Sequence, residues 1–258
     1  MKRIALMLAF ALMATMSIAA QEKKNDALKA DAKPAAPAAG LPSVDEILDK
    51  YVKNTGGKEA IQKQTTRTVK ATFEIEAMGL TGPVQMYSKA PNKSAMVIEI
   101  PNVGTFNEVF DGAKAWSANP MSGLREKSGA ELAAQKRDSD FYQSLNLKSQ
   151  YSKMTVKGKE KVGAGEAYVI EATPAEGGPE KLYFDVTSGL LVRQDAERES
   201  EQGKIAVEIY FEDYKEVDGV KIAHTLKQVT PMFSMTIKTT EVKHNAPIDD
   251  AKFNKPSN

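Results

Sequence analysis

Apolar and polar residues alternate with a period of two along most of the chain after residue 65. Val69, Ala71, Phe73 and Ile75 alternate with lysine, threonine and glutamate, and similar alternation recurs at 96–100, 182–186, 205–211 and 235–237. Side chains on a strand point alternately to opposite faces, so a period of two is typical of a strand with one face in the core. We therefore predict several strands, each with one apolar and one polar face.

Turn signals separate these segments, at 79–82, 111–112, 163–165, 188–189, 202–203 and 218–219. Each contains a glycine, which readily adopts the positive φ that tight hairpin turns require. Turns spaced by roughly ten residues favour an antiparallel meander of about nine to eleven strands.

Two segments have helical rather than strand periodicity. Ser43 and Glu46 have the spacing of a capping box, and they precede an apolar stripe formed by Val44, Ile47, Leu48, Tyr51 and Val52. Gly56 and Gly57 should end this helix. A second helix is predicted from Ser128 to about Leu145. The few helices contrast with the many strands.

This imbalance has a geometric consequence. A sheet with one apolar face must cover it, and two helices about 10 Å wide cannot cover ten strands spaced at about 4.8 Å. A curled, half-open barrel with an apolar hollow under a helical lid satisfies this constraint. Strand parity, which a bulge would reverse, assigns the hollow to Phe73, Ile75, Met96, Ile98, Ile100, Trp116, Leu182, Phe184, Ile205, Val207 and Ile209, and the lid to Leu132, Phe141 and Leu145.

Trp116 has two interpretations, because an aromatic residue beside a hairpin can line a cavity mouth or pack in ordinary core. The interior of the predicted barrel also has two interpretations, a hollow that binds lipid and a core filled by the protein's own side chains. Small barrels are often filled by their own side chains, and a filled barrel would indicate an envelope protein–protein interaction module without lipid cargo.

Candidate catalytic chemistry is sparse. Asp185, Thr187 and Ser188 lie together, but they fall on a predicted hairpin turn without the strand-to-helix elbow and neighbouring base that activate a serine. His224 and His244 have no metal-ligand spacing, and the chain has no cysteine. A hydrolase would need an activated nucleophile that these residues do not indicate. We predict no catalytic site, metal or cofactor.

The N-terminus has the pattern of an export signal. Lys2 and Arg3 precede an apolar run that is too short to span a bilayer, and small residues follow it. We predict a signal peptide at 1–20, a flexible Ala/Pro/Lys tether at 21–41 and one folded domain at 42–258. Cleavage would remove two of the 35 basic residues and leave a nearly neutral protein with 34 acidic residues, which does not favour nucleic-acid binding. The predicted location is the periplasm, with no transmembrane segment after cleavage.

Several short motifs occur in a characteristic order. They are Lys89-Ala90-Pro91-Asn92, Asp111-Gly112 followed by Trp116 and Asn119-Pro120, the YFDVTSGLL hairpin, and Asn245-Ala246-Pro247-Ile248-Asp249 followed by Lys252-Phe253. From Ser43 to Pro256 the chain resembles the LolA/LolB-like superfamily of periplasmic lipoprotein carriers and related lipid-binding proteins.

The resemblance implies an incomplete antiparallel β-barrel of about eleven strands with a helical lid, mainly β in an α+β arrangement. It also implies no cofactor, and a lipid or acylated lipoprotein as the partner, carried from the inner to the outer membrane. In the carriers of this family an arginine precedes the Pro-Asn pair and fastens the lid. Here that position is Ala90, so the resemblance implies that other contacts hold the lid or that the lid is more open. The leading hypothesis is a non-enzymatic lipid or lipoprotein carrier.

Overall fold

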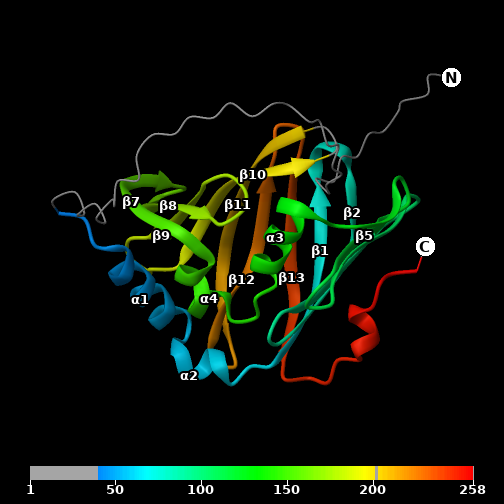
Figure 1. Cartoon of the computed structure of the whole chain (residues 1–258), viewed down its shortest axis with the longest axis horizontal. Helices are drawn as coiled ribbons and strands as arrows, with labels where there is room; N and C mark the ends of the chain where they lie inside the picture. Colours follow the sequence, from blue (N-terminus) through cyan, green and yellow to red (C-terminus); the bar gives the residue numbers. More distant parts are fainter. Residues whose placement is uncertain (1–39, 201–202, 258) are drawn as a thin grey trace, which may run out of the picture.

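The computed structural model describes residues 40–200 and 203–257, which are dominated by one antiparallel sheet of 13 strands (Figure 1). The strands are β1 (Thr66–Ile75), β2 (Leu80–Lys89), β3 (Lys93–Ile100), β4 (Gly104–Phe110), β5 (Ala115–Asn119), β6 (Gly123–Glu126), β7 (Tyr151–Val162), β8 (Gly165–Pro174), β9 (Glu180–Asp185), β10 (Leu191–Ser200), β11 (Gly203–Val217), β12 (Val220–Val229) and β13 (Ser234–His244). The predicted signal peptide and nearly all of the predicted tether lie outside the described residues.

The strand order is β6-β5-β4-β3-β2-β1-β13-β12-β11-β10-β9-β8-β7. The sheet is therefore an incomplete barrel that does not close between β6 and β7, as predicted. Every neighbouring pair is also adjacent in sequence except β1 and β13. We call this pair the seam; in it Arg67 lies opposite His244 and Phe73 opposite Ile237.

The strand count exceeds the predicted number of about eleven. Two short strands lack the alternation on which that prediction depends. Residues 115–118 of β5 are buried on both faces, and β6 has only 4 residues. A strand that is buried on both faces or very short has no clear period of two.

The helices are α1 (Val44–Thr55), α2 (Gly57–Gln62), α3 (Gly129–Asp138) and α4 (Gln143–Asn146), with 3-10 turns η1 (Glu76–Met78), η2 (Leu147–Gln150) and η3 (Asp250–Phe253). The Ser43–Glu46 capping box is confirmed. α1 and α2 lie together on one side of the molecule, and α3 and α4 lie over the middle of the sheet (Figure 1). None of the described helices is long and apolar enough to cross a membrane.

The predicted helix at 128–145 is interrupted after Asp138. The Asp140 carboxylate accepts hydrogen bonds from the backbone N–H of Tyr142 and the side chain of Asn146, at 2.9 Å each. The Phe141 N–H donates to the Pro91 carbonyl on the β2–β3 turn instead of to an earlier turn of helix. An aspartate that bonds nearby backbone in this way competes with helix continuation.

Two apolar clusters lie on the concave face of the sheet. The first, here the filled cluster, consists of Ala71, Phe73, Ile75, Val84, Ile98, Ile100, Phe106, Phe233, Met235 and Ile237. The second, here the α1 cluster, packs Ile47 and Leu48 of α1 against Ile170, Ala172, Leu182, Phe184, Leu191 and Leu147. The concave side is therefore filled by side chains at one end and covered by α1 at the other.

Trp116 lies on the convex face. Ala95, Val109 and Trp116 are successive cross-strand neighbours, and they pack with Phe253 of η3. The next set of cross-strand neighbours, Met96, Glu108 and Ser117, projects to the opposite face, where Met96 packs against the filled cluster. Cross-strand neighbours project to the same side of a sheet, so Trp116 belongs to the outer core beneath the C-terminal segment. The strand alternation that placed Trp116 in the hollow therefore predicted the wrong face for this residue.

Removing the Phe253 ring should expose Trp116, the only tryptophan of the chain. Phe253 is 1% exposed, so we expect Phe253→Ala to lower the free energy of unfolding by about 3–5 kcal/mol and to shift the native tryptophan emission to the red. Met232→Ala, at a side chain that is 46% exposed and outside this cluster, is the control. Unchanged native emission in Phe253→Ala would contradict this packing.

Candidate functional site

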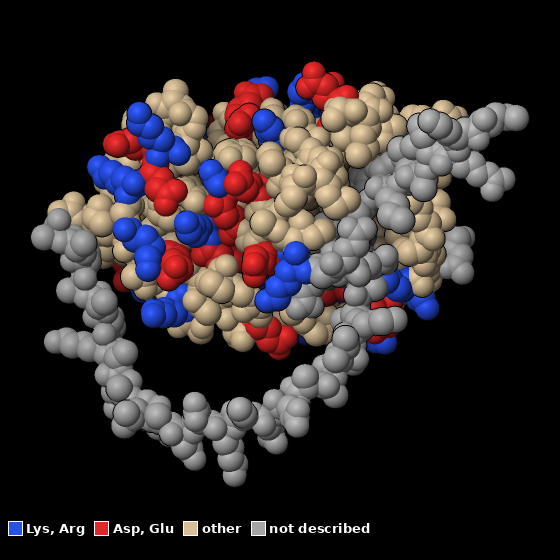
Figure 2. Space-filling view, turned by 90° about the horizontal axis from the view of Figure 1, so that it is seen from above, with Lys and Arg blue, Asp and Glu red and all other residues tan. Residues whose placement is uncertain are grey.

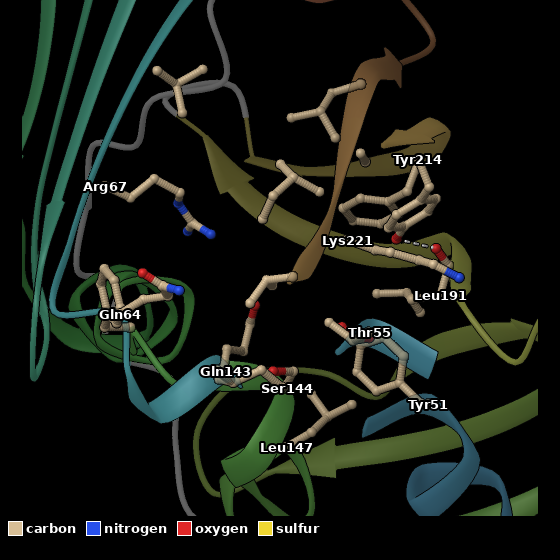
Figure 3. A pocket seen from close by; sticks show the side chains of 18 of the residues that line it. Tyr51, Thr55, Gln64, Arg67, Gln143, Ser144, Leu147, Leu191, Tyr214 and Lys221 are labelled. Carbon is tan, nitrogen blue, oxygen red and sulfur yellow. Dashed lines mark hydrogen bonds between the residues drawn. The ribbon is translucent and has the colours of Figure 1, made fainter. Parts of the chain in front are cut away.

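A pocket of about 260 Å³ lies between the helices and the concave face of the sheet. Its wall combines residues of α1, α2 and the α3–α4 segment with strands on both sides of the seam (Figure 3). Apolar side chains dominate much of this wall, among them Val69, Met86, Leu147, Leu182, Leu191 and Phe211. The volume lies just below the roughly 300–1,000 Å³ of typical small-molecule sites.

The docking of α1 on the β9–β10 turn forms one side of the pocket. Lys50 Nζ donates to the Val186 carbonyl, and Asn54 Nδ2 donates to the Ser188 carbonyl, at 2.7 Å each. Tyr51 lies on the pocket wall and packs edge-on against Phe184 with ring centroids 5.3 Å apart. Burial raises the pKa of Tyr51 to about 12, so this phenol is neutral.

The β9–β10 turn also contains Asp185, Thr187 and Ser188, which were considered as a possible nucleophile site. Asp185 Oδ1 accepts from the backbone N–H of Thr187 and Ser188, and also from the Ser188 hydroxyl at 2.8 Å. Gly189 has φ of 70° and its N–H donates to the Asp185 carbonyl. The polar side chains therefore build the hairpin turn, as predicted, and the turn in turn anchors α1.

Arg67 and His244, which are cross-strand partners at the seam, bring polar groups into the pocket. The Arg67 guanidinium points into the pocket (Figure 3), and its carbon lies 5.6 Å from the centroid of the Phe141 ring. Burial lowers the pKa of Arg67, but an arginine stays protonated in proteins. His244 Nδ1 lies 3.1 Å from Asp218 Oδ2, and burial lowers the pKa of this imidazole.

Two further polar side chains of the wall, Gln64 and Tyr214, are satisfied within the protein. The Tyr214 hydroxyl donates to the Leu191 carbonyl at 2.7 Å. Gln64 Nε2 donates to the Asp218 carbonyl, while Gln64 Oε1 accepts from Asn245. These bonds fix the wall without presenting a charge to the void. Among the described residues that line the pocket there is no aspartate or glutamate.

Ion pairs, rather than apolar contacts, hold α3 over the sheet on the side of β4 to β6. Arg125 donates two hydrogen bonds to the Glu131 carboxylate, at 2.8 and 2.7 Å. Lys127 Nζ lies 2.5 Å from Glu108 and 3.9 Å from Glu131. Glu131 is only 2% exposed, and burial raises its pKa to about 7.

A second set of ion pairs holds α3 on the side of β9 and β10. Glu180 accepts from Arg137 of α3 at 2.9 Å and from Arg198 of β10 at 2.7 Å. Tyr151 also donates to it at 2.9 Å. We call both sets together the α3 ion pairs. They hold α3 over the sheet from both sides.

The structure places the predicted cavity residues in several environments. Leu182 and Phe141 lie on the pocket wall. Phe184 lines a neighbouring cavity of about 200 Å³, and Leu145 lines an outer groove of about 610 Å³. The residues that pack in or against the filled cluster are Phe73, Ile75, Met96, Ile98 and Ile100.

The remaining predicted residues do not line the pocket. Ile209 pairs with Gln194, a wall residue, so it shares the concave face, as does buried Val207 two residues earlier. Ile205 pairs with Arg198 of the α3 ion pairs. Leu132 is a partly buried residue of α3.

Several wall residues were not predicted, and backbone irregularities explain two of them. Phe211 and Tyr214 are an odd number of residues apart, so a regular strand would point them to opposite faces. The positive φ of Asp213, 53°, interrupts this alternation, and both residues line the pocket. A register shift between Lys70 and Ala71 likewise puts His244 out of phase with Met235 and Ile237. Arg67 has the same parity as Val69 and Phe73, so its position on the concave face could have been found.

Comparisons with solved structures identify the fold. The chain is similar to a DUF1329 family protein from Desulfovibrio piger, with 18% identity, a TM-score of 0.56 and coverage of 82% of this chain and 97% of that one. It is also similar to a LolA superfamily protein from Nitrosomonas europaea, with 14% identity, a TM-score of 0.54 and coverage of 83% and 99%. A domain of an outer membrane lipoprotein-sorting protein from Vibrio parahaemolyticus matches with 12% identity, a TM-score of 0.52 and coverage of 81% and 97%.

These similarities show that the chain has the LolA/LolB-like fold, as its motifs indicated. No family model matches the sequence. No curated protein matches it either.

Glu131→Gln should change how stability depends on pH. Because the folded-state pKa of Glu131 is raised to about 7 from 4.5, its protonated form stabilises the fold below about pH 4.5, and this contribution is lost as the pH rises through about 7. The glutamine cannot ionise, so we expect the free energy of unfolding of the variant to vary less over this interval, by at most about 3 kcal/mol. Urea denaturation at a series of pH values measures it.

The matched control is Glu74→Gln, which removes an exposed carboxylate paired with Lys238. We expect this variant to follow the pH dependence of the unmodified protein. A Glu131→Gln curve parallel to the unmodified protein from pH 4.5 to 7 would show that the carboxylate is already ionised in the fold.

Proposed function

We propose that this protein is a non-enzymatic periplasmic carrier or binder of lipid-like molecules, and that an acyl chain occupies the pocket. The observation that carries the proposal is the void of about 260 Å³ that the helices leave on the concave face of the sheet. A preformed, largely apolar concavity with a few polar groups is the usual form of a small-molecule site.

The size of the void sets a limit on the cargo. At about 260 Å³ it suits part of one acyl chain rather than several chains together. The segment 141–147 contributes to both this pocket and the groove of about 610 Å³ outside it. Displacement of this segment would join the two spaces, which would admit a longer chain or a second one.

The alternative of a filled interaction module accounts for only one end of the sheet. Phe73 and Ile98 of the filled cluster are 0% and 1% exposed and occupy the interior there. Beyond this end, the void between the helices and the sheet supports binding of a guest. A lipid or the acyl chain of a lipoprotein fits this environment, and transfer of lipoproteins between membranes is one use of such binding.

Filling the pocket should abolish binding. Ala223 lies on the pocket wall, so Ala223→Phe would place a ring in the void. We expect affinity for a fluorescent fatty acyl probe to fall at least roughly tenfold, while the free energy of unfolding changes by less than about 2 kcal/mol because the ring occupies existing space. Probe titration and urea denaturation measure the two effects.

Ala113→Phe is the matched control, because Ala113 is exposed on the β4–β5 turn away from the pocket. It should bind the probe as the unmodified protein does. If the unmodified protein takes up no acyl probe and carries no extractable lipid from the periplasm, the proposed function is wrong.

A further inference from the structure

Arg67 is an unneutralised cation on the pocket wall. Its side chain makes no hydrogen bond or ion pair with any described residue, and its one specific contact is the Phe141 ring. Elsewhere on the concave side, buried cations have carboxylate partners: Arg125 pairs with Glu131, and Arg198 with Glu180. Arg67 is partly buried, and a guanidinium that is partly withdrawn from water without a counter-charge is costly to the fold.

The surroundings of Arg67 offer no internal counter-charge. The pocket wall contains Arg67 and Lys221 but none of the protein's acidic residues that the structure describes. The outer face seen in Figure 2, by contrast, mixes acidic and basic side chains. The nearest titratable neighbours are Tyr51, a neutral phenol, and His244, which already contacts Asp218. The positive charge of Arg67 therefore faces a largely apolar pocket in which no described carboxylate balances it.

We infer that Arg67 binds the carboxylate of a single-chain fatty acid or related acyl monocarboxylate, whose hydrocarbon chain lies against the apolar wall. This inference rests on the proposed function and specifies its ligand. The guanidinium can donate two parallel hydrogen bonds to one carboxylate. One cation balances one negative charge, whereas a phosphomonoester would bring nearly two. The Lys221 ammonium points away from Arg67 (Figure 3) and does not supply the second cation.

The placement of Arg67 also matches an amphiphile. Arg67 shares the pocket wall with apolar Val69 and Phe141, and with Leu147, Leu182 and Leu191. A head group at the guanidinium would thus direct the chain along this wall. Burying an ion pair is favourable only when the hydrogen bonds are good, so the carboxylate, and not merely the chain, would determine selectivity.

The test compares dodecanoate, dodecanol and dodecyl phosphate on the full mature chain by displacement of a fluorescent acyl probe. We expect dodecanoate to bind roughly ten- to a hundredfold more tightly than dodecanol, as a charge-assisted bidentate contact allows. In Arg67→Met this preference should vanish, while dodecanol binding stays within about threefold. Lys221→Gln, which removes the other cation of the wall, should retain the preference.

A second readout separates ligand binding from a structural role. An unpaired, partly buried cation destabilises the free protein, so Arg67→Met should unfold at equal or higher urea concentration than the unmodified protein. A less stable variant with an unchanged preference would assign Arg67 to holding Phe141 and would overturn the inference.

The remaining outcomes are also decisive. Equal affinity of the unmodified protein for the acid and the alcohol would overturn the inference and leave the proposed function intact. Tighter binding of dodecyl phosphate than of dodecanoate would overturn the choice of a monocarboxylate. Equal loss of preference in Lys221→Gln would reject pairing at Arg67. Failure of all three compounds to bind would overturn the proposed function itself.

Discussion

The concave face of an open antiparallel sheet must be covered without a second sheet, and this requirement organises the whole molecule. At one end the sheet uses its own side chains, and Phe73 and Phe106 fill the space. At the other end α1 supplies Ile47 and Leu48. Neither solution extends across the middle, where the pocket remains. The cavity is thus a product of the ratio of strands to helices rather than of a specialised loop.

Beside the pocket, ion pairs hold α3 over the concave face. α3 buries Glu131 and contributes Arg137, and each pairs with partners from a different part of the sheet. Buried ion pairs contribute little net stability, because desolvation offsets most of their attraction. When such a helix lifts, however, its charged groups regain water, whereas an apolar helix would expose its whole face. Displacing a helix held by ion pairs therefore costs less free energy than displacing one held by an apolar face.

Much of the fold follows from local patterns, whereas the pocket depends on irregularities. The period of two at Phe73 and Ile75 and the capping box at Ser43 both led to the correct elements. The pocket wall depends on a register shift after Lys70 and on the positive φ of Asp213, and neither changes the composition of its strand. The split of α3 from α4 also depends on a contact between Phe141 and Pro91, which are 50 positions apart in the chain. Such long-range contacts cannot be predicted from the local pattern of residues.

The seam has a consequence for how the molecule assembles. Within β1–β6 and within β7–β13, each strand pairs with its neighbour in sequence, so local hairpins can build both halves quickly. Only the β1–β13 pairing joins segments from opposite ends of the domain, and loop-closure entropy makes such contacts slow to form. Arg67 and His244 face each other across this late contact. A ligand bound at this contact would stabilise chains in which the two halves have docked relative to chains in which they have not.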